Sequence, residues 1–285
     1  MHTITKDFIM LLTLRSSFCF IFVAMLSNAS IAQTVTPTAV SINNNTLQAK
    51  LQVTALIAVD LVVEFENSIG LSADNIDISA TLVDINSSMV TNRFSSVDIK
   101  AIPSFPVVIS ISPKPSSGFG FEGLASVEIY TKSVDYNTAM PVRLFRSHAN
   151  GNFEDITAMV SPGSIRARGN TGSFSDFMIL LDERSNADML NDTFTQLTTL
   201  FNHNSGLVSS SLAATIQTSL NTLQNALFTA NYSAAMEAVE ALITLTKHAT
   251  GDQMSNVWRS SDDLLNIQGE LLTRLKTLRY TLRII

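Results

Sequence analysis

The stretch Leu47-Gln48-Ala49-Lys50-Leu51-Gln52-Val53 decides the fold class, because apolar and polar residues alternate strictly along it. A period of two buries one face of a β-sheet and leaves the other face in water. The alternation returns over residues 60–66, where Val62 interrupts the polar face. Further strands are predicted at Ile76–Val83, Ser96–Ile102, Val107–Ser112 and Leu124–Thr131.

Two hairpins close this region. Asn150-Gly151 lies between two predicted strands, and both residue types accept the positive φ of a tight hairpin turn. A second pair of strands flanks Gly169-Asn170-Thr171-Gly172. Turn signals about every ten residues predict an antiparallel, immunoglobulin-like β-sandwich of about seven to nine strands over residues 33–184.

The pattern changes over residues 185–285, where aliphatic residues fall at helical spacing. Four stripes are present, beginning at Leu190, Leu212, Met236 and Leu264. They predict a small bundle of about four helices after the sandwich, and therefore an α+β fold. The last nine residues also alternate as a strand would, so helix and strand both remain open there, with the longer helical stripe favouring helix.

Residues 1–32 have the organisation of a signal peptide. Basic residues come first, an apolar run spans residues 18–26, and Ser30 and Ala32 fit a cleavage site before Gln33. The apolar run is too short to cross a bilayer. We therefore expect export to the periplasm or the exterior, with no transmembrane span after cleavage. The alternative is an uncleaved anchor that begins near Phe8, although Arg15 interrupts it.

Composition excludes several classes of protein. The 285-residue chain has a formal net charge of −6, which disfavours nucleic-acid binding. Its single cysteine, Cys19, lies within the predicted signal peptide, so the mature chain has no disulfide and no cysteine-ligated metal. No cofactor is predicted.

Three parts of the chain resemble known families. The segments Asn150–Thr157 and Gly172–Phe177 resemble the closing hairpins of bacterial extracellular β-sandwiches. The helices around Leu220–Ile243 are similar to the FIMAH module that ends many secreted bacterial proteins. The stretch from Trp258 to Tyr280 resembles the end of an uncharacterised bacterial secreted family, a domain of unknown function. That resemblance covers nearly all of the mature chain, and it implies no activity and no catalytic residue.

Two features suggest chemistry but have simpler explanations. Gly118-Phe119-Gly120-Phe121-Glu122-Gly123 matches the dinucleotide pattern, yet a β-like segment follows it where a helix is needed, which favours a loop. His148, His203 and His248 are isolated, without the paired spacing of a helical metal site. No nucleophile elbow is present, so a hydrolase would need residues that converge only in three dimensions.

The strongest candidate ligand residues are Trp258, Arg259, Asp263 and Asn266, which we expect at the start of the last long helix. The alternative is that Trp258 plugs the junction of sandwich and bundle while Arg259 pairs with Asp263 at i,i+4. The basic residues near the C-terminus, Arg274 among them, are expected to be solvated; binding to anionic headgroups is a second possibility.

These observations predict an exported, non-catalytic binding or scaffolding protein of the bacterial periplasm or cell surface, with an unknown protein or glycan partner. One alternative is a secreted hydrolase, with a pocket that holds one of the three histidines beside a carboxylate and a hydroxyl. Another is a carbohydrate-binding sandwich with exposed aromatic residues. The candidates for such stacking are Phe119, Phe121, Tyr130 and Tyr136.

Overall fold

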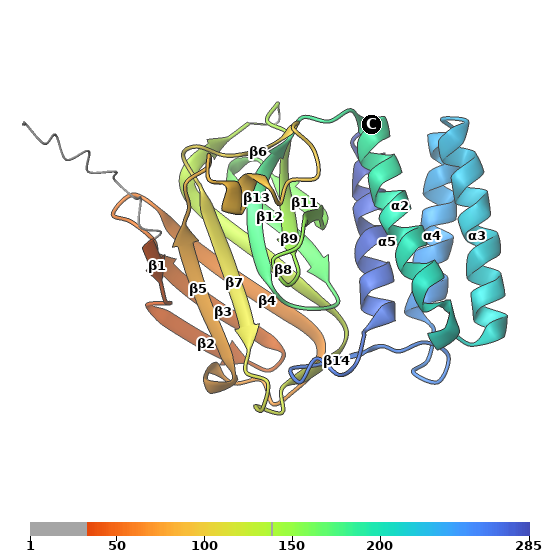
Figure 1. Ribbon diagram of the computed structural model, residues 1–285, viewed down its shortest axis with the longest axis horizontal. Helices are drawn as coiled ribbons and strands as arrows, with labels where there is room; N and C mark the ends of the chain where they lie inside the picture. Colours follow the sequence, from red (N-terminus) through yellow and green to blue (C-terminus); the bar gives the residue numbers. More distant parts are fainter. Residues whose placement is uncertain (1–32, 138) are drawn as a thin grey trace, which may run out of the picture. The chain divides into compact units, whose positions relative to one another are not determined.

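The computed structural model describes residues 33–137 and 139–285. They form two antiparallel β-sheets and five α-helices, most of which follow the sheets in the sequence, so the predicted α+β class is confirmed (Figure 1). The predicted signal peptide, residues 1–32, lies outside the described residues.

The first sheet has seven strands and only antiparallel pairings. In spatial order it contains β1 (Gln33–Val35), β5 (Ile76–Leu82), β7 (Val107–Pro113), β13 (Asp176–Asp182), β9 (Val142–Ser147) and β10 (Phe153–Asp155), and β6 (Ile99–Ala101) also pairs with β13. The predicted turn at Asn150-Gly151 connects β9 to β10, and both Ala149 and Asn150 have positive φ.

The second sheet also has seven antiparallel strands. In order it contains β11 (Thr157–Ser161), β12 (Gly163–Thr171), β8 (Gly120–Tyr136), β4 (Ala58–Ile69), β3 (Thr46–Gln52) and β2 (Ala39–Asn43), and β14 (Val257–Arg259) also pairs with β8. The alternating stretch forms β3, whose apolar side chains are buried and whose polar side chains are exposed.

The main core lies between the two sheets. Leu61 on β4 packs there with Ile109 on β7 and Phe177 on β13, all fully buried. The described residues contain more strands than the seven to nine predicted. Four of them, β1, β6, β10 and β14, are three residues long and too short to carry a period-two signal of their own.

The four predicted helices are confirmed. They are α2 (Asn186–Asn204), α3 (Ser210–Phe228), α4 (Tyr232–Lys247) and α5 (Ile267–Arg283). A fifth, α1 (Ser88–Thr91), is a single turn between β5 and β6, and short 3₁₀ turns occur at Ala73–Asn75 and Ser205–Leu207. Side chains of Ser185, Asn231 and Asn266 cap the starts of α2, α4 and α5 by accepting a backbone hydrogen bond.

Helix α5 connects the two parts of the fold. It packs between α2 and α4, and it also packs against β8, β11 and β12, while α3 packs on α4 (Figure 1). Almost every side of α5 is therefore buried. The helix predicted for the C-terminal segment is confirmed, since α5 continues to Arg283.

The segment before α5 corrects one prediction. Trp258 and Arg259 do not begin the last helix but form β14, which pairs with residues 120–122 of β8. Helix α5 begins only at Ile267. The open edge of β8 offers backbone hydrogen-bond partners to this segment, and these outweigh its helical spacing. The loop predicted at Gly118–Gly123 is wrong for its last four residues, because strand β8 begins at Gly120.

No helix within residues 33–137 and 139–285 has the length and apolar character needed to cross a membrane.

Candidate functional site

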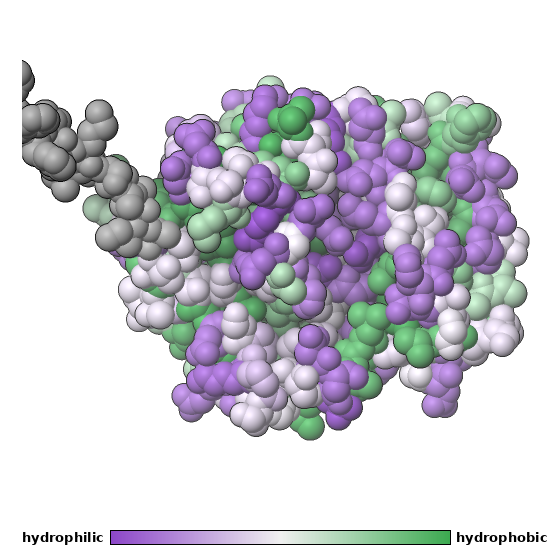
Figure 2. All heavy atoms as spheres, in the orientation of Figure 1, coloured by the Kyte–Doolittle hydropathy of each residue, from purple (hydrophilic) through white to green (hydrophobic). Residues whose placement is uncertain are grey.

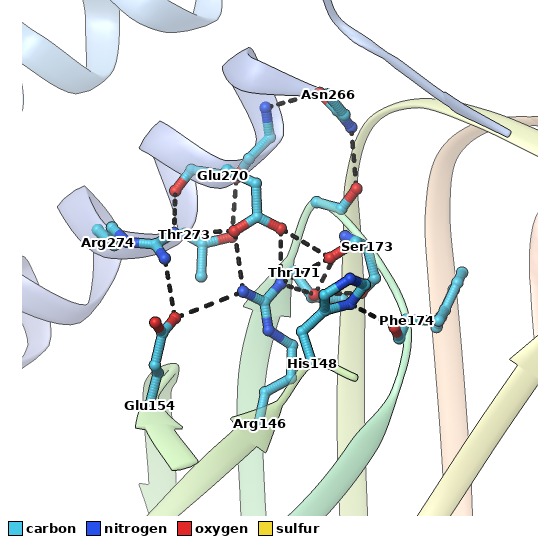
Figure 3. A network of polar contacts seen from close by, with 12 residues as sticks. Arg146, His148, Glu154, Thr171, Ser173, Phe174, Asn266, Glu270, Thr273 and Arg274 are labelled. Atoms are coloured by element: carbon cyan, nitrogen blue, oxygen red, sulfur yellow. Dashed lines mark hydrogen bonds and ion pairs between the residues drawn. The ribbon is translucent and has the colours of Figure 1, made fainter. Parts of the chain in front are cut away.

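A buried charge network attaches α5 to the sandwich (Figure 3). The guanidinium of Arg146 on β9 donates to both oxygens of Glu270 on α5, from Nη1 at 2.6 Å and from Nη2 at 2.8 Å. Arg274, one turn further along α5, donates to Glu270 at 2.8 Å and to Glu154 of β10 at 2.8 Å. Such two-pronged arginine–carboxylate pairs fix geometry as well as charge.

The network keeps Glu270 and Arg146 ionised. Burial opposes the charge on Glu270, but the positive charges and hydrogen bonds of Arg146 and Arg274 together lower the pKa of this carboxyl well below its usual range. Burial likewise opposes the charge on Arg146, and the carboxylates of Glu270 and Glu154 raise its pKa. Glu270 is therefore an ionised structural carboxylate and a poor proton acceptor.

An open pocket of about 500 Å³ lies against this network. Its size is typical of small-molecule sites. It is lined by Arg146, His148, Glu154, Ser173, Leu200, Trp258, Asp262, Asp263, Leu264, Leu265, Glu270 and Arg274. The lining residues come from both sheets, from α2 and α5, and from the segment between β14 and α5, so the pocket exists only where sheet and helices meet. We refer to it as the junction pocket.

Three residues that line the junction pocket each carry a buried donor without a partner. The described residues contain four buried side-chain polar atoms without a hydrogen-bond partner. Three of them, Arg146 Nε, Arg274 Nε and Trp258 Nε1, belong to residues that line this pocket. A buried N–H group without an acceptor is uncommon in folded proteins and calls for an explanation. The three nitrogens are themselves buried, so they belong to the packed walls of the pocket and not to its open space.

The sequence-predicted ligand residues lie at or beside the junction pocket. Trp258 and Asp263 line it, whereas Arg259 and Asn266 are not among its lining residues. Arg259 pairs with Asp263 at 2.9 Å, as predicted, although the pair joins the end of β14 to the segment that follows it and does not lie on a helix. The Asn266 side chain accepts from the Gly269 amide at 2.8 Å and donates to the Gly123 carbonyl at 2.7 Å, so it fixes α5 to β8.

Trp258 has a largely structural environment. Its ring lies 5.5 Å from that of Phe174, 5.6 Å from that of Phe121 and 6.2 Å from that of Phe119, measured between centroids. Phe119 and Phe121 are themselves buried, so their predicted role as exposed aromatic residues for sugar stacking is wrong. Tyr130 and Tyr136 are partly exposed.

The histidines separate into two groups. His148 lines the junction pocket beside Ser173 and two glutamates, while His203 and His248 lie at the C-terminal ends of α2 and α4. The hydroxyl of Ser173 donates to Glu270 at 2.9 Å, and Nδ1 of His148 lies 3.3 Å from the carbonyl oxygen of Phe174 (Figure 3). A catalytic serine would instead be hydrogen-bonded to the imidazole.

Sequence reasoning missed the residues at the centre of the network. Arg274, expected to be solvated, is buried, because Glu270 and Glu154 compensate its charge in the interior. Arg146 was not singled out at all. The available signal was a pair of arginines, Arg143 and Arg146, among the apolar residues of the strand Val142–Ser147, since a buried charge requires a partner elsewhere.

Another hollow is larger, but only one of the side chains that line it is charged. A hollow of about 640 Å³ lies along the segment from Ile85 to Pro103, and its one charged lining residue, Lys100, is paired with Glu183. The unpartnered donors of residues 33–137 and 139–285 do not belong to its lining. Within the same residues, no group of three or more histidine, cysteine or acidic side chains could hold a metal ion.

The fold and the pocket define a two-sheet α+β protein with a ligand-sized cavity beneath its C-terminal helices. The chain belongs to a family of unknown function, DUF6689, which matches residues 20–285. This confirms the predicted membership in a domain of unknown function. No curated protein and no solved structure matches the chain.

Proposed function

We propose that this protein is an exported, non-catalytic binding protein of the bacterial periplasm or cell surface, and that the junction pocket is its ligand site. The observation that carries this proposal is an open pocket of about 500 Å³ whose walls carry the charged side chains of Arg146, Arg274 and Glu154 beside the ring of Trp258. The proposed ligand is a small molecule, or the end of a glycan or peptide, that carries hydrogen-bond acceptors.

Other features support parts of the proposal. The predicted signal peptide at residues 1–32 supports export, and the resemblance of the C-terminal helices to the FIMAH module supports a bacterial secreted protein. The pairing of Ser173 with an ionised glutamate, and not with His148, supports a non-catalytic role. Export is tested by expressing the full chain in a bacterial host and measuring the mass of the recovered protein. The mass should match a chain that begins at Gln33.

The binding test uses the only tryptophan of the chain, Trp258, as a reporter inside the pocket. Purified residues 33–285 are titrated with oligosaccharides, dipeptides and organic carboxylates while the Trp258 emission is followed. One class should change the emission with saturation, and His148→Ala should weaken that binding. His203→Ala is the matched control, because His203 is also exposed, hydrogen-bonds a backbone carbonyl and lies outside the pocket.

The same preparation distinguishes the hydrolase alternative. Ester, peptide and glycoside substrates are incubated with the wild type and with Ser173→Ala. Turnover that the substitution abolishes would overturn the non-catalytic proposal, and a complete lack of binding across the panel would overturn the ligand site.

A further inference from the structure

The end of helix α3 carries the most exposed large apolar side chain among the described residues. Phe228, the last residue of α3, is 90% exposed. Burying a phenylalanine side chain stabilises a protein or a complex by about 1.5–3 kcal/mol, so a ring left in water is available for association.

A small hollow lies directly beside Phe228. Its volume is about 190 Å³, and it is lined by Ala187, Leu190, Asn191, Phe194, Gln224, Leu227, Phe228 and Tyr232. It forms where α2 begins and α3 ends, because α2 packs mainly on α5 and α3 mainly on α4. Apolar surface is visible at this upper right end of the molecule (Figure 2). An engineered apolar cavity of about 150 Å³ holds a benzene molecule, so this hollow is large enough for a phenyl ring.

The face of α3 beside the hollow carries no charged side chain. Residues 193–236 contain no aspartate, glutamate, lysine or arginine, and this stretch includes all of α3. The exposed positions of α3 are serine, alanine, threonine, asparagine, glutamine and Phe228. The whole chain carries a net charge of −6, so two copies repel each other elsewhere on their surfaces but not here. Depletion of charged residues is also what distinguishes the centre of a protein interface.

We propose that this face is a self-association surface and that its occupant is a second copy of the chain. A projecting ring beside a ring-sized hollow is self-complementary under a two-fold axis, so Phe228 of each copy enters the hollow of the other. The uncharged face of α3 then packs along the axis. This association is separate from the junction pocket, which is lined by Leu200 near the end of α2 and by the first part of α5, whereas the hollow is lined by the first residues of α2.

The surface area that α2 and α3 offer determines how tightly two copies should bind. Two helices of 19 residues, each about 28 Å long and about 10 Å wide, present roughly 560 Å² per copy. A standard interface buries about 800 Å² per partner. The dimer should therefore be weak, with a dissociation constant in the range of about 1–100 µM.

The test is sedimentation velocity of residues 33–285 from about 1 to about 300 µM, with three variants. The wild type should pass from monomer to dimer across this range. Phe228→Ser should raise the dissociation constant by at least about tenfold. Gln224→Arg should do the same by bringing two positive charges together at the mouth of the hollow. The control Leu56→Ser, at a side chain 87% exposed on the sandwich, should dimerise as the wild type does.

Three other results would overturn the proposal. A wild type that remains monomeric at the highest concentration excludes the dimer, and a dimer unaffected by Phe228→Ser excludes this surface. Co-sedimentation with phosphatidylethanolamine–phosphatidylglycerol vesicles, present in the wild type and lost in Phe228→Ser, would assign the face to a membrane if the protein itself stays monomeric. Circular dichroism of each variant verifies that the helices are intact.

Discussion

Replacement of Glu270 by glutamine tests whether the buried charge network holds the helices on the sandwich. Glu270 accepts two hydrogen bonds from Arg146, one from Arg274 and one from Ser173. Glutamine is nearly the same size, but it removes the negative charge and turns an NH₂ group toward arginine donors. Arg146, only 3% exposed, then loses its main counter-charge. Removing one partner of a buried ion pair costs about 3–5 kcal/mol, and we expect Glu270→Gln to lose that much.

The assay is urea unfolding at pH 7, followed by the emission of Trp258 and by circular dichroism. The matched control is Glu240→Gln on α4, because Glu240 also faces two arginines, Arg279 at 3.5 Å and Arg283 at 3.3 Å, but is 43% exposed. Glutamate and glutamine have similar helix propensities, so only the burial of the charge differs. The control should lose at most about 1 kcal/mol. Equal, small losses in both variants would refute the argument that the junction depends on this network.

Three further results are expected. The pKa of Glu270 is lowered in the folded protein, so on acidification the unfolded state takes up a proton first. Below about pH 5 this group should therefore destabilise the wild type by up to about 1.4 kcal/mol per pH unit. Urea curves at pH 7, 5 and 3 should show that the difference in unfolding free energy between the wild type and Glu270→Gln becomes smaller. Trp258→Phe should lower the free energy of unfolding, measured by chemical denaturation, by less than about 1.5 kcal/mol, because it removes an unpartnered N–H along with part of the ring. A loss as large as that expected for Trp258→Ala, about 3–5 kcal/mol, would contradict this. Gly269→Ala should lower the melting temperature although alanine favours helix, because its Cβ would lie 2.7 Å from the Gly123 carbonyl oxygen; an increase would show that α5 can move away from β8.

Local patterns predicted the elements because a period of two or of 3.6 is a property of consecutive residues. The alternation at Leu47–Val53 became β3, and the four aliphatic stripes became α2 to α5. The same reasoning failed for Trp258-Arg259, where β8 supplied hydrogen-bond partners from far along the chain. It also failed for Arg274, whose charge is compensated partly by Glu154 on another element.

The candidate site could be predicted only in part. Trp258 and Asp263 were singled out by their residue types, and both line the junction pocket. Arg146 was not, because its partner Glu270 lies 124 residues further along the chain and no spacing connects them. The hydroxyl of Ser173 likewise gains its position only from a turn that faces the start of α5.

The sequence by itself determined that strands precede helices, which faces of them are apolar, and that a segment with signal-peptide character comes first. Only the tertiary structure decided that α5 lies against both the sandwich and its neighbouring helices, that β14 returns to β8, and that a pocket with charged walls forms between them. The physical reason is that periodicity records which side of an element avoids water. The partners that bury it are chosen by packing and by charge compensation across the whole chain.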